Sequence, residues 1–126
     1  RTPEALEVLY ARSALVTAAA AYGLQAIDLV TVDFRNTEQA RRDALFGAQL
    51  GYTGKQVIHP AQVEPVQAAF TPDDEAIAYA KRVVETFEMN QARGAGAYDL
   101  DGKMIDLPLL KSAQNVLERA RAAGKV

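Results

Sequence analysis

The run Ala26–Phe34, AIDLVTVDF, limits the folds open to this chain more than any other stretch. Apolar and β-branched residues fill it almost without a break, which is typical of a parallel strand buried on both faces of its sheet. A second run of this kind, Lys55–His59, is stopped by Pro60. Helical periodicity and end signals predict helices over residues 3–22, 36–50 and 61–70. The order α-β-α-β-α predicts an α/β fold with a parallel sheet.

The pattern changes at Thr71, where a second part of the chain begins. The predicted order is a helix to about Arg93, a break at Gly94–Gly96, a hairpin, and a last helix over Leu109–Ala123. Two strands neither close a parallel sheet nor cover their own faces, so we expect residues 1–70 to end a larger α/β domain. The start at Arg1, without a Met and directly before a helix, suggests the same. We expect residues 71–126 to form a small appended module.

The hairpin within residues 96–108, GAYDLDGKMIDLP, holds the carboxylate of greatest interest. Two short apolar-containing runs flank Asp101-Gly102, and this pair favours a type I′ turn because both central residues need positive φ. The return strand places Asp106 among apolar neighbours, just before Pro108 opens a helix. Apolar surroundings would raise the pKa of the Asp106 carboxyl group and suit it to proton transfer. The alternative is that Asp106 only caps the helix that follows.

Two further groups of candidate residues lie where the predicted strands end, because ligands bind at the C-terminal ends of strands in parallel α/β folds. They are Asp33, Phe34 and Arg35 after the first strand, and Ile58, His59 and Pro60 after the second. Asp33 either orients a ligand or caps the next helix. The His59 ring either donates to a ligand or is satisfied at the strand end, and the backbone around Ile58 and His59 is the stronger candidate for ligand contact. Asp28 lies inside its strand, where we expect a buried partner.

Composition excludes several classes of function. The 14 basic and 16 acidic side chains give a net charge of −2, without the basic surplus that nucleic-acid binding requires. The chain has no cysteine and one histidine, which excludes disulfides, thiol catalysis and a His-rich metal site within it. No apolar run is long enough to cross a membrane, no signal peptide is visible, and no phosphate-binding glycine loop precedes a helix. We therefore expect neither a nucleic-acid partner nor a membrane partner.

Three motifs resemble one known family. Residues 23–30, GLQAIDLV, residues 54–60, GKQVIHP, and residues 104–111, MIDLPLLK, are similar in order and spacing to the C-terminal part of the citrate lyase β-subunit-like proteins. These proteins belong to a wider group of acyl-CoA lyases and aldolases that includes the malyl-CoA and citramalyl-CoA lyases. The resemblance implies a TIM barrel, with the two predicted strands as the last two of the barrel. It also implies that residues 71–126 form a helix–hairpin–helix lid over a neighbouring subunit, in a homotrimer or hexamer.

The resemblance further implies an activity. The protein would be a Mg²⁺-dependent carbon–carbon lyase that cleaves a 3-hydroxyacyl-CoA, such as citramalyl-CoA or malyl-CoA, into acetyl-CoA and a 2-oxoacid. Asp106 would be the acid/base, and Ile58 and His59 would contact the CoA substrate. The family's Mg²⁺ ligands and acyl-binding arginines precede the matched region, so we expect no metal site and no catalysis from these 126 residues alone. The alternatives are a malate-synthase-type condensation with thioester hydrolysis, or a non-catalytic assembly module. We expect a cytoplasmic location, or the mitochondrial matrix in a eukaryote.

Overall fold

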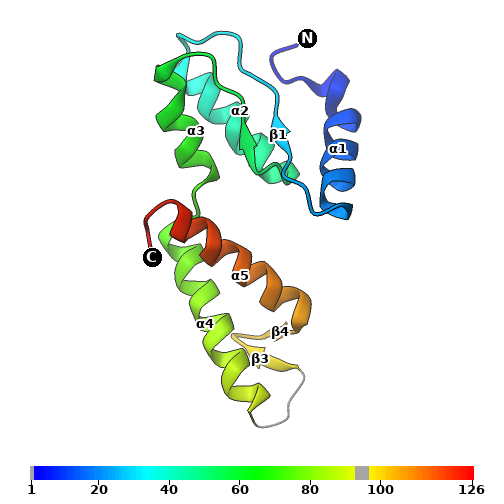
Figure 1. Cartoon of the computed structure of the whole chain (residues 1–126), viewed down its shortest axis with the longest axis vertical. Coiled ribbons are helices and arrows are strands. Elements are labelled where there is room, and N and C mark those ends of the chain that lie inside the picture. Colours follow the sequence, from blue (N-terminus) through cyan, green and yellow to red (C-terminus); the bar gives the residue numbers. More distant parts are fainter. Residues whose placement is uncertain (1, 93–96) are drawn as a thin grey trace. The chain divides into compact units, whose positions relative to one another are not determined.

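The chain up to Phe70 builds one unit around a short parallel strand pair (Figure 1). The computed structural model describes residues 2–92 and 97–126. Strand β1, Ile27–Asp28, runs parallel to β2, Gly54–Lys55, with Asp28 opposite Lys55. The helices of the unit are α1 (Leu9–Ala21), α2 (Thr37–Leu50) and α3 (Val63–Phe70), and the 3₁₀ turns η1 (Leu6–Val8) and η2 (Pro60–Gln62) precede α1 and α3. The predicted α/β order and parallel pairing are confirmed.

Both strands are shorter than the predicted runs. The Gln56 amide donates to the Asp28 carbonyl at 3.1 Å, and this is the last backbone bond between the two segments in the described residues. Beyond it a side chain takes over, since Lys55 Nζ donates to the Leu29 carbonyl. Of the described strands, only β2 pairs with β1. The ladder therefore ends early, because a strand extends only as far as a neighbour can satisfy its backbone groups.

Local signals set the helix ends of this unit. Asn36 caps α2 by accepting a hydrogen bond from the Gln39 amide at 2.9 Å. Gly23 and Gly51 follow α1 and α2 with φ of 65° and 99°, the left-handed conformation that commonly ends a helix. The starts of the first and third helices differ from the prediction, because the 3₁₀ turns η1 and η2 stand directly before α1 and α3.

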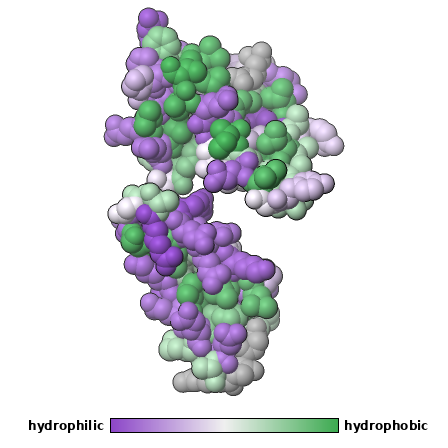
Figure 2. Space-filling view, viewed as in Figure 1, coloured by the Kyte–Doolittle hydropathy of each residue, from purple (hydrophilic) through white to green (hydrophobic). Residues whose placement is uncertain are grey.

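Apolar side chains lie at the surface of the first unit (Figure 2). Leu6, Tyr10 and Leu15, in η1 and α1, are 62%, 87% and 51% exposed, and Ile27 of β1 is 51% exposed. Buried apolar residues of this unit are mostly small, namely Ala5, Ala26, Ala40 and Ala44, together with Tyr52 and Val66. The unit thus leaves large apolar groups uncovered and buries mainly small ones.

The second unit, from Thr71 onward, packs two helices and a hairpin around its own core (Figure 1). Its elements are α4 (Asp74–Gln91), β3 (Tyr98–Leu100), β4 (Lys103–Ile105) and α5 (Leu107–Ala122). The strands are antiparallel, and Asp101 and Gly102 join them with φ of 54° and 76°, as the predicted type I′ turn requires. The core residues are Ala80, Val83, Phe87, Ile105 and Ala113.

Two expectations for this unit concern residues that the structure does not describe. The predicted continuation of α4 to Arg93 and the break at Gly94–Gly96 lie outside the described residues.

Across the described ranges, no helix has the length and apolar character that a membrane span requires.

Candidate functional site

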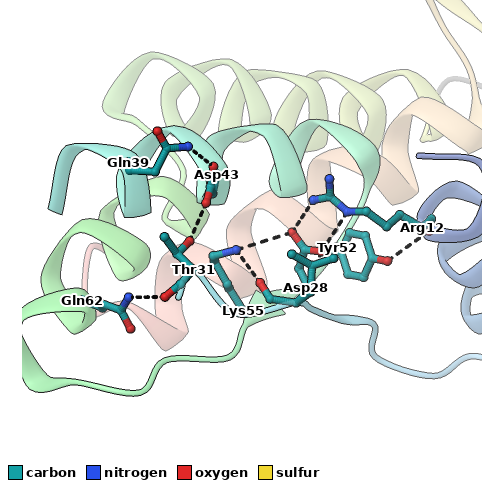
Figure 3. A network of polar contacts seen from close by, with 9 residues as sticks. Arg12, Asp28, Thr31, Gln39, Asp43, Tyr52, Lys55 and Gln62 are labelled. Carbon is teal, nitrogen blue, oxygen red and sulfur yellow. Dashed lines mark hydrogen bonds and ion pairs between the residues drawn. The ribbon is translucent and has the colours of Figure 1, made fainter. Parts of the chain in front are cut away.

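A buried ionic network surrounds Asp28 at the centre of the first unit (Figure 3). Arg12 reaches it from α1, with Nη2 2.7 Å from Oδ2 and Nε 3.2 Å from Oδ1. Lys55 Nζ lies 3.9 Å from Oδ2, and the side chains of all three residues are almost wholly buried. The expected buried partner of Asp28 is therefore a pair of cations. A carboxylate held in this way fixes α1 against the strand pair and has little freedom for chemistry.

Close backbone approach completes the packing around Asp28. A Cβ atom on Gly47 would lie 2.4 Å from Asp28 Oδ2, so only glycine lets α2 lie this close to β1. Tyr52 makes a further contact with α1, because its hydroxyl donates to the Arg12 carbonyl at 3.1 Å (Figure 3). Burial, and then the charge of Asp28, raise the pKa of Tyr52. The tyrosine is thus held as a neutral hydrogen-bond donor.

A second chain of hydrogen bonds links the segments that follow β1 and β2. Gln62 Nε2 donates to the Thr31 carbonyl at 2.8 Å, and the Ile58 amide donates to Gln62 Oε1 at 2.9 Å. Thr31 Oγ1 in turn donates to Asp43 Oδ2 at 2.6 Å, and Gln39 Nε2 donates to Asp43 Oδ1 at 2.6 Å (Figure 3). An open cleft of about 720 Å³ lies along this chain, lined in part by residues 30–33 and by Gln39 and Asp43 of α2.

The structure brings the two strand-end clusters of the sequence analysis together. The rings of Phe34 and His59 stack with centroids 4.8 Å apart and an interplanar angle of 25°. The Arg35 guanidinium carbon lies 4.9 Å from the centre of the Phe34 ring. Ile58 directly precedes His59 in the sequence. It is 58% exposed, so its side chain is accessible to a ligand. Pro60 is the first residue of η2.

Asp33 and His59 each accept a hydrogen bond from a nearby backbone amide, and these bonds limit the roles that the two side chains can have. Asp33 does not cap α2, since Asn36 does, and Asp33 Oδ1 instead accepts from the Arg35 amide at 3.2 Å. His59 caps η2, because its Nδ1 accepts from the Ala61 amide at 3.1 Å. In the neutral imidazole this places the hydrogen on Nε2, so His59 offers an N–H donor there.

Asp106 stands at the junction of β4 and α5, in surroundings that differ from the expected ones. It is exposed, and although Ile105 is buried, Met104 and Leu107 are 76% and 57% exposed. The expectation of apolar surroundings within this chain was wrong, because Asp106 itself is exposed while the neighbouring Ile105 points into the core. Asp106 caps α5, because its Oδ1 accepts from the Leu109 amide at 3.0 Å. Among the described residues no other donor bonds to this carboxyl group, so Oδ2 is open for chemistry.

The described residues contain no group of three or more His, Asp or Glu side chains that could hold a metal ion. Asp28 is already paired with cations, and both oxygens of Asp43 accept hydrogen bonds from side chains.

Sequence analysis missed Gln62, Thr31 and Arg12. Gln62 and Arg12 are 1% and 6% exposed, although both residue types usually lie at the surface. One signal was available for Gln62, since a lone amide stood in the first turn after the strand-stopping Pro60. No local signal marked Arg12, because its partner lies 16 residues away along the chain.

Comparisons with known proteins give one consistent result. The model of the HpcH/HpaI aldolase/citrate lyase family matches residues 1–60. The chain is 49% identical over 117 residues to the mitochondrial citramalyl-CoA lyase of Homo sapiens, an alignment that covers 93% of this chain and 34% of that protein. It is 40% identical over 122 residues to the citrate lyase subunit beta of Haemophilus influenzae, covering 97% of this chain and 42% of that subunit.

Solved structures agree with these relatives. CitE of Mycobacterium tuberculosis, in complex with magnesium, acetoacetate and coenzyme A, matches with a TM-score of 0.76 and 33% identity, over 89% of this chain and 40% of that one. A citrate lyase of Burkholderia xenovorans matches with a TM-score of 0.78 and 30% identity, over 98% of this chain and 38% of that one. The chain thus spans between about a third and two fifths of the length of these proteins.

Proposed function

Because this chain belongs to the HpcH/HpaI aldolase/citrate lyase family, we propose that it is part of a carbon–carbon lyase that cleaves a 3-hydroxyacyl-CoA thioester. The substrate is citramalyl-CoA or malyl-CoA, and the products are acetyl-CoA and a 2-oxoacid. The observation that carries the proposal is the 49% identity, over 93% of the chain, to a protein named citramalyl-CoA lyase. That name also supports the mitochondrial matrix as the location in a eukaryote, with the cytoplasm as the location otherwise.

In this proposal the first unit supplies the last two strands of a TIM barrel, and the second unit is the lid. The exposed apolar side chains of η1, α1 and β1 support the first assignment, because further barrel elements would cover them. The exposed Met104 and Leu107 support the second, since they form an apolar rim on either side of Asp106. The lid closes over the barrel of a neighbouring subunit in a homotrimer or hexamer, and the apolar surroundings that Asp106 lacks here then come from the partner.

The reaction needs a proton at one carbon atom. As the bond between the thioester α-carbon and the hydroxyl-bearing carbon breaks, its electron pair passes to the α-carbon as an enolate. The hydroxyl-bearing carbon becomes the carbonyl carbon of the 2-oxoacid, and its hydroxyl proton leaves to a base that we do not assign within this chain. Asp106 delivers a proton to the α-carbon from Oδ2 and removes it in the reverse condensation. The cap on Oδ1 holds the carboxyl group in place at the N-terminal end of α5.

We assign the binding of the CoA part of the substrate to Ile58 and His59. The Ile58 side chain is exposed, and His59 offers its Nε2–H to an acceptor on the ligand. We also propose Mg²⁺ dependence, supported by the magnesium in the CitE complex. Its ligands are expected upstream of this chain, because the described residues offer no metal-binding cluster.

The experiment that tests the proposal replaces Asp106 by Asn in the full-length protein that carries this chain. Asn caps a helix about as well as Asp but cannot exchange the proton, so we expect folding and CoA binding to be kept. Turnover of citramalyl-CoA or malyl-CoA should fall roughly 10²–10⁴-fold, the usual share of general acid–base catalysis. Asp73→Asn is the matched control, because Asp73 caps α4 in the same way, with 2.7 Å to the Ala76 amide.

Several outcomes would change the assignment. Equal turnover of the Asp106→Asn variant and the parent would leave Asp106 as a cap only. A parent that condenses acetyl-CoA with glyoxylate and releases free CoA would be of the malate-synthase type. A parent inactive in both assays would favour the assembly module.

If the lid serves a neighbour, mixing the Asp106→Asn subunits with subunits inactivated in the barrel should restore part of the activity.

A further inference from the structure

Gln62 is the most completely buried neutral polar side chain in the first unit, and it contacts the backbone on both sides of the candidate ligand site. It is 1% exposed. Its Oε1 accepts from the Ile58 amide at 2.9 Å, and its Nε2 donates to the Thr31 carbonyl at 2.8 Å. One amide group therefore joins the segment after β2 to the segment after β1.

We infer that Gln62 is a positioning residue that holds the Ile58–His59 backbone in the geometry that contacts CoA. The inference rests on the proposed function, since it takes from it the contact of Ile58 and His59 with the CoA substrate. Gln62 itself is buried and touches no ligand in this scheme. It acts through the conformation of the segment that it holds.

Two bonds of opposite polarity explain why an amide stands at this position. The Ile58 amide needs an acceptor and the Thr31 carbonyl needs a donor, and the primary amide of Gln supplies both without a titratable group. Buried backbone groups that lose their partner are costly, so the segment would rearrange to find new ones. Asn would be one methylene too short to span both groups.

The bonds continue beyond Gln62 on both sides. Thr31 is anchored to α2 by its bond to Asp43, so the Ile58 segment is positioned relative to a long helix and not to another loop. In addition, the backbone N–H of Gln62 donates to the His59 carbonyl at 3.0 Å. This bond lies within η2, the same turn that the His59 ring caps. Holding this turn keeps the His59 ring stacked on Phe34 and directs its Nε2.

The test compares Gln62→Met and Gln62→Glu in the full-length protein, with Tyr52→Phe as the control. Met matches Gln in shape but makes neither bond. Glu keeps an acceptor for the Ile58 amide. At a pH high enough to ionise it, its carboxylate gives no donor to Thr31 and adds a buried charge, so all variants are compared at that pH. Tyr52→Phe removes one buried hydrogen bond of the same unit, to the Arg12 carbonyl, without touching the strand-end segments.

The variants should rank differently in Tm and in their Kd for CoA. The Tm should fall further for Gln62→Glu than for Gln62→Met, because a buried charge costs more than a lost neutral bond. The Kd for CoA, measured by calorimetry, should rise about tenfold for Gln62→Met, as expected when the binding-competent conformation becomes a minor one, and less for Gln62→Glu. The KM for the acyl-CoA should follow the Kd, with a smaller change in kcat. Tyr52→Phe should lower the Tm and leave the Kd unchanged.

Amide hydrogen exchange at Ile58 separates this inference from the proposed function. Exchange should be faster in Gln62→Met and near the parental rate in Gln62→Glu and Tyr52→Phe. A Kd that follows the Tm across all variants, or an unchanged exchange rate at Ile58 in Gln62→Met, would overturn the inference. A parent that binds no CoA would overturn the proposed CoA site and with it the role given to Gln62, whereas a CoA-binding parent with an unaffected Gln62→Met variant would overturn the inference alone.

Discussion

Asp28 and Asp106 are the same residue type in opposite situations. Asp28 is 1% exposed in the first unit, and its oxygens face Arg12, Lys55 and the backbone of Gly47. Asp106 is exposed in the second unit and is held by a single amide on one of its two oxygens. A carboxylate whose two oxygens are both paired with cations supports structure, whereas one that is anchored through one oxygen keeps the other for a ligand.

His59 follows the pattern of Asp106 and not that of Asp28. It caps η2 through Nδ1 and leaves Nε2 open, just as Asp106 caps α5 through Oδ1 and leaves Oδ2. In both cases the cap fixes the side chain at the start of a helix without using its second polar atom. Capping and function are therefore compatible here, and the two alternatives for each residue do not exclude one another.

The largest expected effect separates Asp28 from the other two residues. Asp28→Ala should lower the free energy of unfolding by roughly 3–5 kcal/mol, because Arg12 and Lys55 would stay buried without a counter-charge. A denaturant titration followed by circular dichroism measures this loss. Glu38→Ala is the control, since Glu38 also binds an arginine, Arg41, but both side chains are about half exposed. That control should have little effect, and an equally small loss for Asp28→Ala would break the comparison.

A smaller effect on stability is expected at Asp106. Asp106→Ala removes only the bond to the Leu109 amide, so the second unit should lose about 0.5–2 kcal/mol, the usual contribution of an N-cap. The same titration, on the Asp106→Ala and Asp106→Asn variants, checks the value. Asn should restore most of the loss. A loss of unfolding free energy as large as that of Asp28→Ala would mean that Asp106 stabilises the fold through more than its cap.

The smallest effect on stability, and a specific effect on binding, is expected at His59. His59→Asn keeps an acceptor for the Ala61 amide but has no donor at the position of Nε2, while His59→Gln reaches that position with an amide. We expect His59→Asn to raise the KM for the acyl-CoA about 2–10-fold, the value of one hydrogen bond, with a smaller change in kcat. His59→Gln should show a smaller rise. Steady-state kinetics that show an unchanged KM and a collapsed kcat would indicate a chemical role for His59.

The candidate site shows where prediction from the sequence succeeds and where it does not. The parallel strand pair and the type I′ turn at Asp101-Gly102 follow from patterns that act over a few residues. The stack of Phe34 on His59 was within reach, because both residues follow neighbouring parallel strands. The exposure of Asp106 was not, since apolar neighbours in the sequence need not be apolar neighbours in space. Leu107 follows Asp106 directly and is exposed, whereas Ile105, directly before it, is buried in the core.

By itself, the sequence determined the local conformations: the cap at Asn36, the positive φ at Gly51 and Gly102, and the cap at Asp106. These depend on the φ/ψ preferences and short polar side chains of adjacent residues, which act within one turn of the chain. Tertiary structure alone decided which distant groups meet: Arg12 with Asp28, 16 residues apart, and Gln62 with Thr31, 31 residues apart. Such pairs form because packing excludes water from polar groups that must then find partners, and no pattern within a single helix or strand specifies which partner that will be.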